Sequence, residues 1–236
     1  MESSSFGRLF GVLFSPGKTF RSIAERPTWL VALLVILLSA AAMAFIAGKR
    51  TDYRDVITQS TRERGQEASE AQLEQGITMM EKAGPLIGAV SAPVVITVLM
   101  LIAAGLYWML FKLTGSDFSY KSSFAVTLYA SMPVVVMMLL SIPVILSRST
   151  ITYADMKRSG GSYLQSNLSF LAPEDAPNWL TALYSSLDFF SIWALVLTII
   201  GFRAVTRKPT QSVAITVIVI WLIFVAIRVG WVALFS

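Results

Sequence analysis

Five long apolar stretches constrain this chain more than any other feature of its sequence. Each is 19 to 26 residues long, and the first three contain no charged residue. A helix needs about 20 apolar residues to cross the hydrocarbon core of a bilayer. We therefore predict five transmembrane helices, at residues 29–47, 86–111, 122–146, 180–202 and 212–235.

The composition agrees with an all-α membrane protein. Hydrophobic residues make up 55% of the chain and charged residues 14%, against about 25% charged residues in soluble domains. The five stretches predict one transmembrane domain at 29–236, which a cytoplasmic tail at 1–28 precedes. The sequence has no cysteine and no histidine, which excludes disulfides, the commonest zinc sites and a Ser-His-Asp triad. We expect no catalytic residues, no metal, no cofactor and no enzymatic activity.

The tail is patterned as two short amphipathic helices. Residues Phe6, Leu9, Phe10 and Leu13 follow helical spacing on one face, and Ser15-Pro16 suits the start of a second helix. We expect both helices to lie in the cytoplasmic membrane interface. The alternative is a cytosolic elbow packed on the bundle. The residues expected at the lipid interface are Arg8, Phe10, Lys18, Phe20 and Arg21.

The loops indicate the orientation of the chain. The side that holds the N-terminus carries nine basic residues in 47 loop positions, and the opposite side carries nine in 71. Basic residues concentrate on the cytoplasmic side. We expect a multi-pass protein of the cell (inner) membrane with its N-terminus in the cytoplasm and its C-terminus outside. The net charge of +5 then indicates anionic lipid as a partner, and not nucleic acid.

Local signals add detail to the spans and to the first outer loop. Ser69 and Gln72 fit a capping box, which predicts a helix up to Lys82 that ends at Gly84-Pro85. Three prolines lie inside spans and are expected to kink helices without binding ions. They are Pro93, Pro133 and Pro143.

Asp188 and Arg228 are the only charged residues within the five stretches. Counting from the outer ends of the fourth and fifth spans places both about 10–12 Å below the same boundary. A charge deep in the bilayer is costly, so we predict an ion pair between them with a structural role. The alternative is that Arg228 extends to the outer interface while Asp188 faces water.

Three sequence stretches together resemble the bacterial branch of the Yip family of Ypt/Rab-interacting membrane proteins. They are FSPGKTF at 14–20, GSDFSYK at 115–121 leading into YASMP at 129–133, and DFFSIW at 188–193. The resemblance covers nearly the whole chain. It implies a cytoplasmic N-terminus, five helices and no known catalytic activity. Eukaryotic members bind Rab-type GTPases and influence vesicle formation, but the tail here is only 28 residues, which counts against GTPase binding.

These observations lead to two hypotheses for the function. The first is a non-enzymatic membrane protein that scaffolds a membrane-protein partner, whose identity the sequence does not give, or that shapes and organises the membrane. The second is a small permease or an accessory subunit of a transporter. Transporters often show paired repeats and ionisable residues near the midplane, and the sequence contains no internal repeat.

Overall fold

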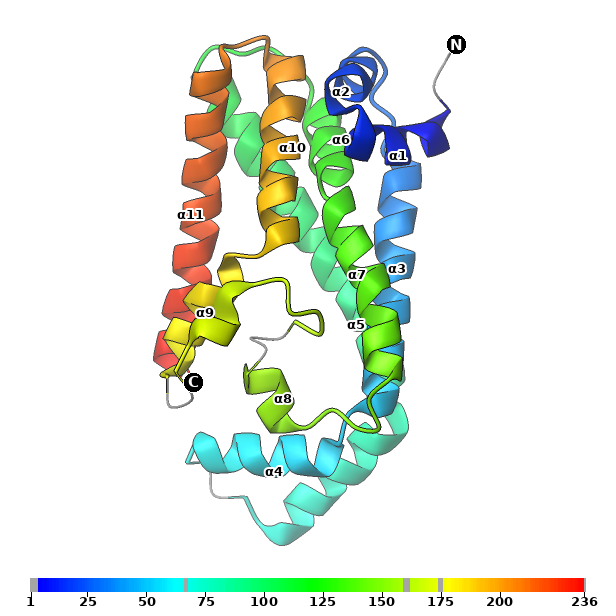
Figure 1. Ribbon diagram of the computed structural model, residues 1–236, viewed down its shortest axis with the longest axis vertical. Helices are drawn as coiled ribbons and strands as arrows, with labels where there is room; N and C mark the ends of the chain where they lie inside the picture. The colour runs from blue at the N-terminus through cyan, green and yellow to red at the C-terminus, as the bar shows by residue number, and fades with distance from the viewer. Residues whose placement is uncertain (1–3, 66–67, 159–161, 174–175, 236) are drawn as a thin grey trace. The chain divides into compact units, whose positions relative to one another are not determined.

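The computed structural model describes residues 4–65, 68–158, 162–173 and 176–235. Within them, five helical segments are long and apolar enough to cross a membrane (Figure 1), which confirms the all-α membrane bundle. They are α3 (Leu30–Arg50), α5 (Glu70–Leu113), α6 with α7 (Tyr120–Ala130 and Met132–Leu146), α10 (Phe189–Thr206) and α11 (Thr210–Phe235). The shorter elements are α1 (Ser5–Phe14), α2 (Pro16–Glu25), α4 (Tyr53–Glu63), α8 (Tyr153–Arg158), the 3₁₀ helix η1 (Leu168–Leu171) and α9 (Asn178–Ser186).

The chain divides into two compact units. The first contains Met1–Ser39, Pro93–Met137 and Phe189–Phe224, and the second contains Ala40–Ala92, Met138–Asp188 and Val225–Ser236. Helices α3, α5, α7 and α11 therefore contribute residues to both units. The first unit holds the N-terminal helices, and the second holds the short helices of the loops.

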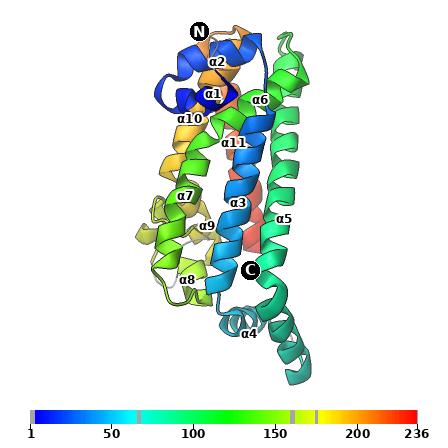
Figure 2. The same ribbon diagram turned by 90° about the vertical axis from the view of Figure 1, so that its right-hand side faces the viewer.

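The tail forms the two helices that its pattern predicts. The Ser4 hydroxyl accepts a hydrogen bond from the Gly7 N–H at 3.1 Å, which caps α1. Ser15 occupies the cap position of α2, with Pro16 in the first turn, but the Ser15 side chain makes no capping bond. Both helices pack against α6, and α2 also packs against α10 (Figures 1 and 2).

The apolar residues of α1 separate onto two faces. Leu9 and Val12 are buried in the core of the first unit, beside Phe20 and Ile23 of α2. On the other face, Phe6 is 66% exposed, Phe10 is 65% exposed and Phe14 is 80% exposed. Since these three residues are spaced four apart, they form one continuous stripe, which we call the aromatic ridge.

Arg8 fastens α1 to the end of α2. It is only 6% exposed. One terminal nitrogen donates to the Arg26 carbonyl at 2.8 Å and to the Thr28 hydroxyl at 2.9 Å. The other donates to the carbonyl and hydroxyl of Ser22 at 3.3 and 2.9 Å. The carbonyls of Ser22 and Arg26 belong to the C-terminal end of α2, where a cation is favoured.

Aromatic rings fill the core between the spans of the first unit. The ring centroid of Phe202 lies 5.2 Å from Phe111 and 4.6 Å from Tyr107. A Cβ atom built on the neighbouring Gly201 would lie 2.5 Å from a methyl group of Val126 and 2.9 Å from the ring of Phe20. Glycine at this position therefore allows α10 to approach both α2 and α6 closely.

In the second unit, the capping box before α5 is confirmed. The Ser69 N–H donates to the Gln72 side chain at 3.1 Å, and the Gln72 N–H donates to the Ser69 hydroxyl at 3.3 Å. The predicted end of this helix at Gly84-Pro85 is wrong, because α5 continues through both residues. A proline removes only one hydrogen bond, and helices with apolar partners tolerate that loss.

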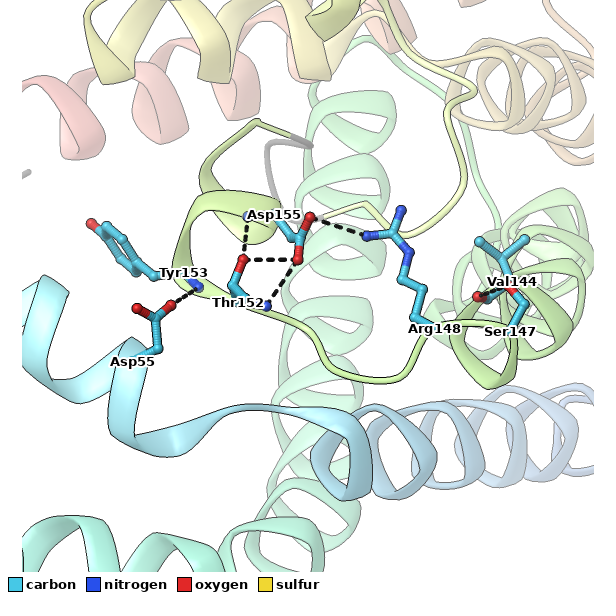
Figure 3. Close-up of polar contacts among 7 residues, drawn as sticks. All are labelled: Asp55, Val144, Ser147, Arg148, Thr152, Tyr153 and Asp155. Carbon is cyan, nitrogen blue, oxygen red and sulfur yellow. Dashed lines mark hydrogen bonds and ion pairs between the residues drawn. The ribbon is translucent and has the colours of Figure 1, made fainter.

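The two loops of the second unit are joined by short-range polar contacts. Figure 3 shows Asp155 accepting hydrogen bonds from the N–H and hydroxyl of Thr152, at 3.0 and 2.8 Å, and meeting Arg148 at 3.5 Å. The Thr152 N–H, followed by its hydroxyl, lowers the pKa of Asp155 below its ordinary value. The Tyr153 N–H donates to Asp55 of α4 at 2.8 Å, so α8 is fixed to α4.

We predict that Arg8→Ala lowers the stability of the protein in detergent by about 2–3 kcal/mol, because it leaves buried acceptors without a charged donor. Arg8→Lys should recover only part of the loss, since one ammonium group cannot occupy both guanidinium positions. Thermal unfolding measures the effect. The control is Lys18→Ala, which removes an exposed cation from α2. Equal melting temperatures for Arg8→Ala and the control would contradict the role of Arg8.

Candidate functional site

An open cavity of about 960 Å³ lies in the first unit. Three elements surround it: one side of α2, the link between α5 and α6 together with the first turn of α6, and the C-terminal end of α10. We call it the charged cavity. The charged residues that line it are Arg21, Glu25, Asp117, Arg203 and Arg207, and the hydroxyl residues are Ser119, Ser122 and Thr206.

The cationic groups come from two helices. Arg21 donates through Nε to the Gly17 carbonyl at 3.1 Å, a bond that does not use its terminal nitrogens. Arg203 belongs to the last turn of α10 and Arg207 directly follows that helix, and both line the cavity. Arg207 has a φ of 56°, the left-handed conformation that commonly ends a helix. This turn leads the chain directly to Pro209 and α11.

The remaining wall belongs to the α5–α6 link. The Ser119 hydroxyl accepts a hydrogen bond from the Ser122 N–H at 3.1 Å, which caps α6. Asp117 contributes a carboxylate to the cavity, and Glu25 contributes a second one from α2. The site therefore combines three guanidinium groups with two carboxylates. Such a set can hold a ligand that carries both phosphate and amine.

The residues predicted at the lipid interface occupy different environments. Phe10, Lys18 and Arg21 are exposed. Arg8 and Phe20 are buried inside the first unit, at 6% and 0% exposure. These two do not lie at the surface. The guanidinium of Arg8 bonds to carbonyls at the C-terminal end of α2, and the ring of Phe20 packs in the core of the first unit. In the described part of the chain, no cluster of three or more His, Cys, Asp or Glu side chains could hold a metal.

Asp188 lies at a break between helices. The predicted span 180–202 is divided here, since α9 ends at Ser186 and α10 begins at Phe189. Asp188 is 5% exposed and accepts a hydrogen bond from the Ser166 hydroxyl. It also pairs with Asn167 in an isolated antiparallel bridge. A carboxylate in this position ties the preceding loop to the start of α10.

Arg228 reaches the same break from α11. Its terminal nitrogens donate to the hydroxyls of Ser185 at 2.9 Å and Ser186 at 3.2 Å. These serines are two and three residues from Asp188 along the chain. The structure thus brings the guanidinium to the segment that contains Asp188. The ion pair itself stays a prediction.

The three prolines expected to kink helices occur in different settings. Pro133 follows a true interruption, because α6 ends at Ala130 and α7 begins at Met132. The intervening Ser131 hydroxyl donates to the Thr127 carbonyl at 2.9 Å. Pro93 and Pro143 lie inside α5 and α7, and the kinks there stay predictions.

Sequence reasoning missed most of the charged cavity. It selected Arg21 but did not group it with the basic residues at the end of the fourth span. The available signal was the pair of arginines that follows the fourth span, Arg203 and Arg207. What the sequence lacked was the fold of the tail, which brings α2 alongside the end of α10.

We predict that Asp188→Asn and Arg228→Gln each lower the stability of the detergent-solubilised protein, and that their effects are coupled. The charge exchange Asp188→Arg with Arg228→Asp should recover part of the stability that a single reversal loses. Thermal unfolding of the single and double variants gives the coupling energy. Additive effects, or single variants as stable as the original protein, would rule out the pair.

Comparison with known proteins agrees with the architecture. The family model for the Yip1 domain matches residues 10–231. The Membrane protein YknW of Bacillus subtilis (strain 168) is 26% identical over 223 residues, which covers 92% of this chain and 87% of that protein. No solved structure matches the chain. The match extends from α1 into the last turns of α11, so this multi-pass membrane protein belongs to the Yip1 domain family.

Proposed function

We propose that this protein is a non-enzymatic membrane organiser whose N-terminal helices bind the cytoplasmic surface of the bilayer and present a site for membrane-protein partners. The single observation that carries the proposal is the division of α1 into a docked face and the aromatic ridge. A helix held on one side by Arg8, Leu9 and Val12 can expose phenylalanine rings on the other only where an apolar medium or partner covers them.

The membrane interface is the medium that suits this arrangement best. Amphipathic helices in that position bury their apolar face between the headgroups and the acyl chains. Lys18 is exposed on α2, close in sequence to the ridge, where anionic headgroups attract a cation. The density of basic residues in the loops supports a cytoplasmic location for this end of the chain.

The position of the ridge can be tested in the full-length protein, because the chain has no cysteine. We expect a spin label on Phe10→Cys, in vesicles that contain anionic lipid, to collide with dissolved oxygen and to be shielded from a water-soluble nickel complex. A label on Lys18→Cys should show the opposite pattern. If both labels are equally accessible to nickel, the ridge is not in the bilayer and the proposed lipid contact fails.

Orientation has a separate test. We expect Lys18→Cys to be protected from a membrane-impermeant thiol reagent in intact cells and to react after the cells are opened. Gln165→Cys, which is exposed in the loop before α9, should react in intact cells. The reverse pattern would place the N-terminus outside.

A second candidate, a small permease or an accessory subunit of a transporter, is favoured by the α9–α10 break. Discontinuous helices with charged residues form the substrate sites of many transporters, and this break contains Asp188 and lies beside Arg228. Flux assays on proteoliposomes decide between the candidates. Specific solute flux by the purified chain, abolished in Asp188→Asn, would establish the permease and overturn the organiser.

A further inference from the structure

The charged cavity has a composition that simple membrane attachment does not require. Arg21, Arg203 and Arg207 face one space of about 960 Å³ together with Glu25 and Asp117. Basic residues that only mark the cytoplasmic side of a membrane protein need no shared cavity and no carboxylates. This space is also within the range of small-ligand sites, which is about 300–1,000 Å³.

We propose that the charged cavity binds the headgroup of a phospholipid that carries a primary amine, such as phosphatidylethanolamine. The inference rests on the proposed function in that it takes the ligand from the bilayer, but it uses none of the residues of the aromatic ridge.

The arginines supply the phosphate site. A guanidinium group matches phosphate oxygens with two parallel hydrogen bonds. Salt bridges of the described chain lie away from the cavity, at Arg54–Glu74, Arg148–Asp155 and Lys157–Glu63, and among the described residues Arg203 and Arg207 form none. The guanidinium groups of Arg203 and Arg207 are therefore not neutralised by the neighbouring carboxylates. The capped first turn of α6, at Ser119, adds a favourable helix end to the same wall.

The carboxylates select the rest of the headgroup. Glu25 and Asp117 would repel a ligand that is only anionic, because three cations and two anions leave a net charge of just +1. A zwitterionic headgroup can pair its phosphate with the arginines and its cation with the carboxylates. A primary ammonium group donates up to three hydrogen bonds to carboxylate oxygens, whereas the trimethylammonium group of choline donates none. The charge pattern thus favours an ethanolamine headgroup over choline or glycerol.

The apolar part of the cavity points to a membrane source for this headgroup. Ile200, Ala204 and Val205 line the cavity beside the arginines, and all three belong to the membrane-spanning helix α10. An acyl chain can follow this wall, while a soluble phosphate would leave it in contact with water. We therefore assign the ligand to the bilayer.

The test measures lipid binding to the purified full-length protein, by native mass spectrometry and by the thermal shift in detergent. We expect phosphatidylethanolamine to bind at least tenfold more tightly than phosphatidylcholine or phosphatidylglycerol. Arg203→Gln/Arg207→Gln should weaken that binding at least tenfold, and Arg203→Lys/Arg207→Lys should recover part of it. Glu25→Gln/Asp117→Asn should remove the preference for ethanolamine over choline.

A matched control is Arg62→Gln/Arg158→Gln, which makes the same change in net charge at two exposed positions in the second unit. It should bind phosphatidylethanolamine as the original protein does. The proposal is overturned if the cavity variant binds within twofold of this control, or if phosphatidylglycerol binds as tightly as phosphatidylethanolamine. Soluble glycerophosphoethanolamine that stabilises the protein as much as the lipid would overturn the membrane source.

The melting temperature of each variant without lipid checks that the variant folds. If the glutamine variants do not fold, the lysine variants still test the phosphate site. Phe6→Ser/Phe10→Ser separates this inference from the proposed function. It should weaken the interaction of α1 with the bilayer and leave headgroup binding unchanged. Loss of headgroup binding in this variant would show that the cavity does not act as an independent site.

Discussion

A peptide group inside a bilayer finds no water to bond with, and this constraint governs the whole structure. Every backbone N–H and C=O in the hydrocarbon core must be satisfied within the protein, which helices achieve with local bonds. Polar side chains then compensate where a helix is interrupted. The Ser131 hydroxyl donates to the carbonyl of Thr127 at the α6–α7 break. At the α9–α10 break the Ser166 hydroxyl donates to the Asp188 carboxylate, a contact between side chains that holds the preceding loop in place.

The same need to satisfy backbone carbonyls explains the role of Arg8 at the C-terminal end of α2. The C-terminal end of a helix favours a cation near its last carbonyls, and the guanidinium of Arg8 donates to the carbonyls of Ser22 and Arg26 from α1. This single side chain converts two short helices, each marginal in isolation, into a docked pair. Because α1 is held by one face, its phenylalanine rings remain available to lipid. Because α2 is held in place, Arg21 and Glu25 line the charged cavity.

The two functional surfaces of the first unit therefore depend on different chemistry. The aromatic ridge depends on apolar area, which binds a membrane without selecting a headgroup. The charged cavity depends on the pairing of opposite charges, which gives selectivity more than affinity. The proposed organisation of lipid would use both properties, since attachment alone would not distinguish one lipid from another. Membership of the Yip1 domain family is consistent with either surface serving a partner protein as well.

Elements whose causes are local could be predicted from the amino-acid sequence. Apolar length predicted the spans, and the Ser69–Gln72 spacing predicted a cap that the structure contains. Which helix faces meet depends on long-range packing and could not be predicted in this way. Arg8 and Phe20 were expected at the lipid interface together with Lys18, yet they are buried, because helix spacing places residues on a face without saying what covers it. The charged cavity was not predicted for the same reason. It forms because α2 and α10 approach closely at Gly201, and a contact between segments so far apart in the chain produces no local sequence pattern.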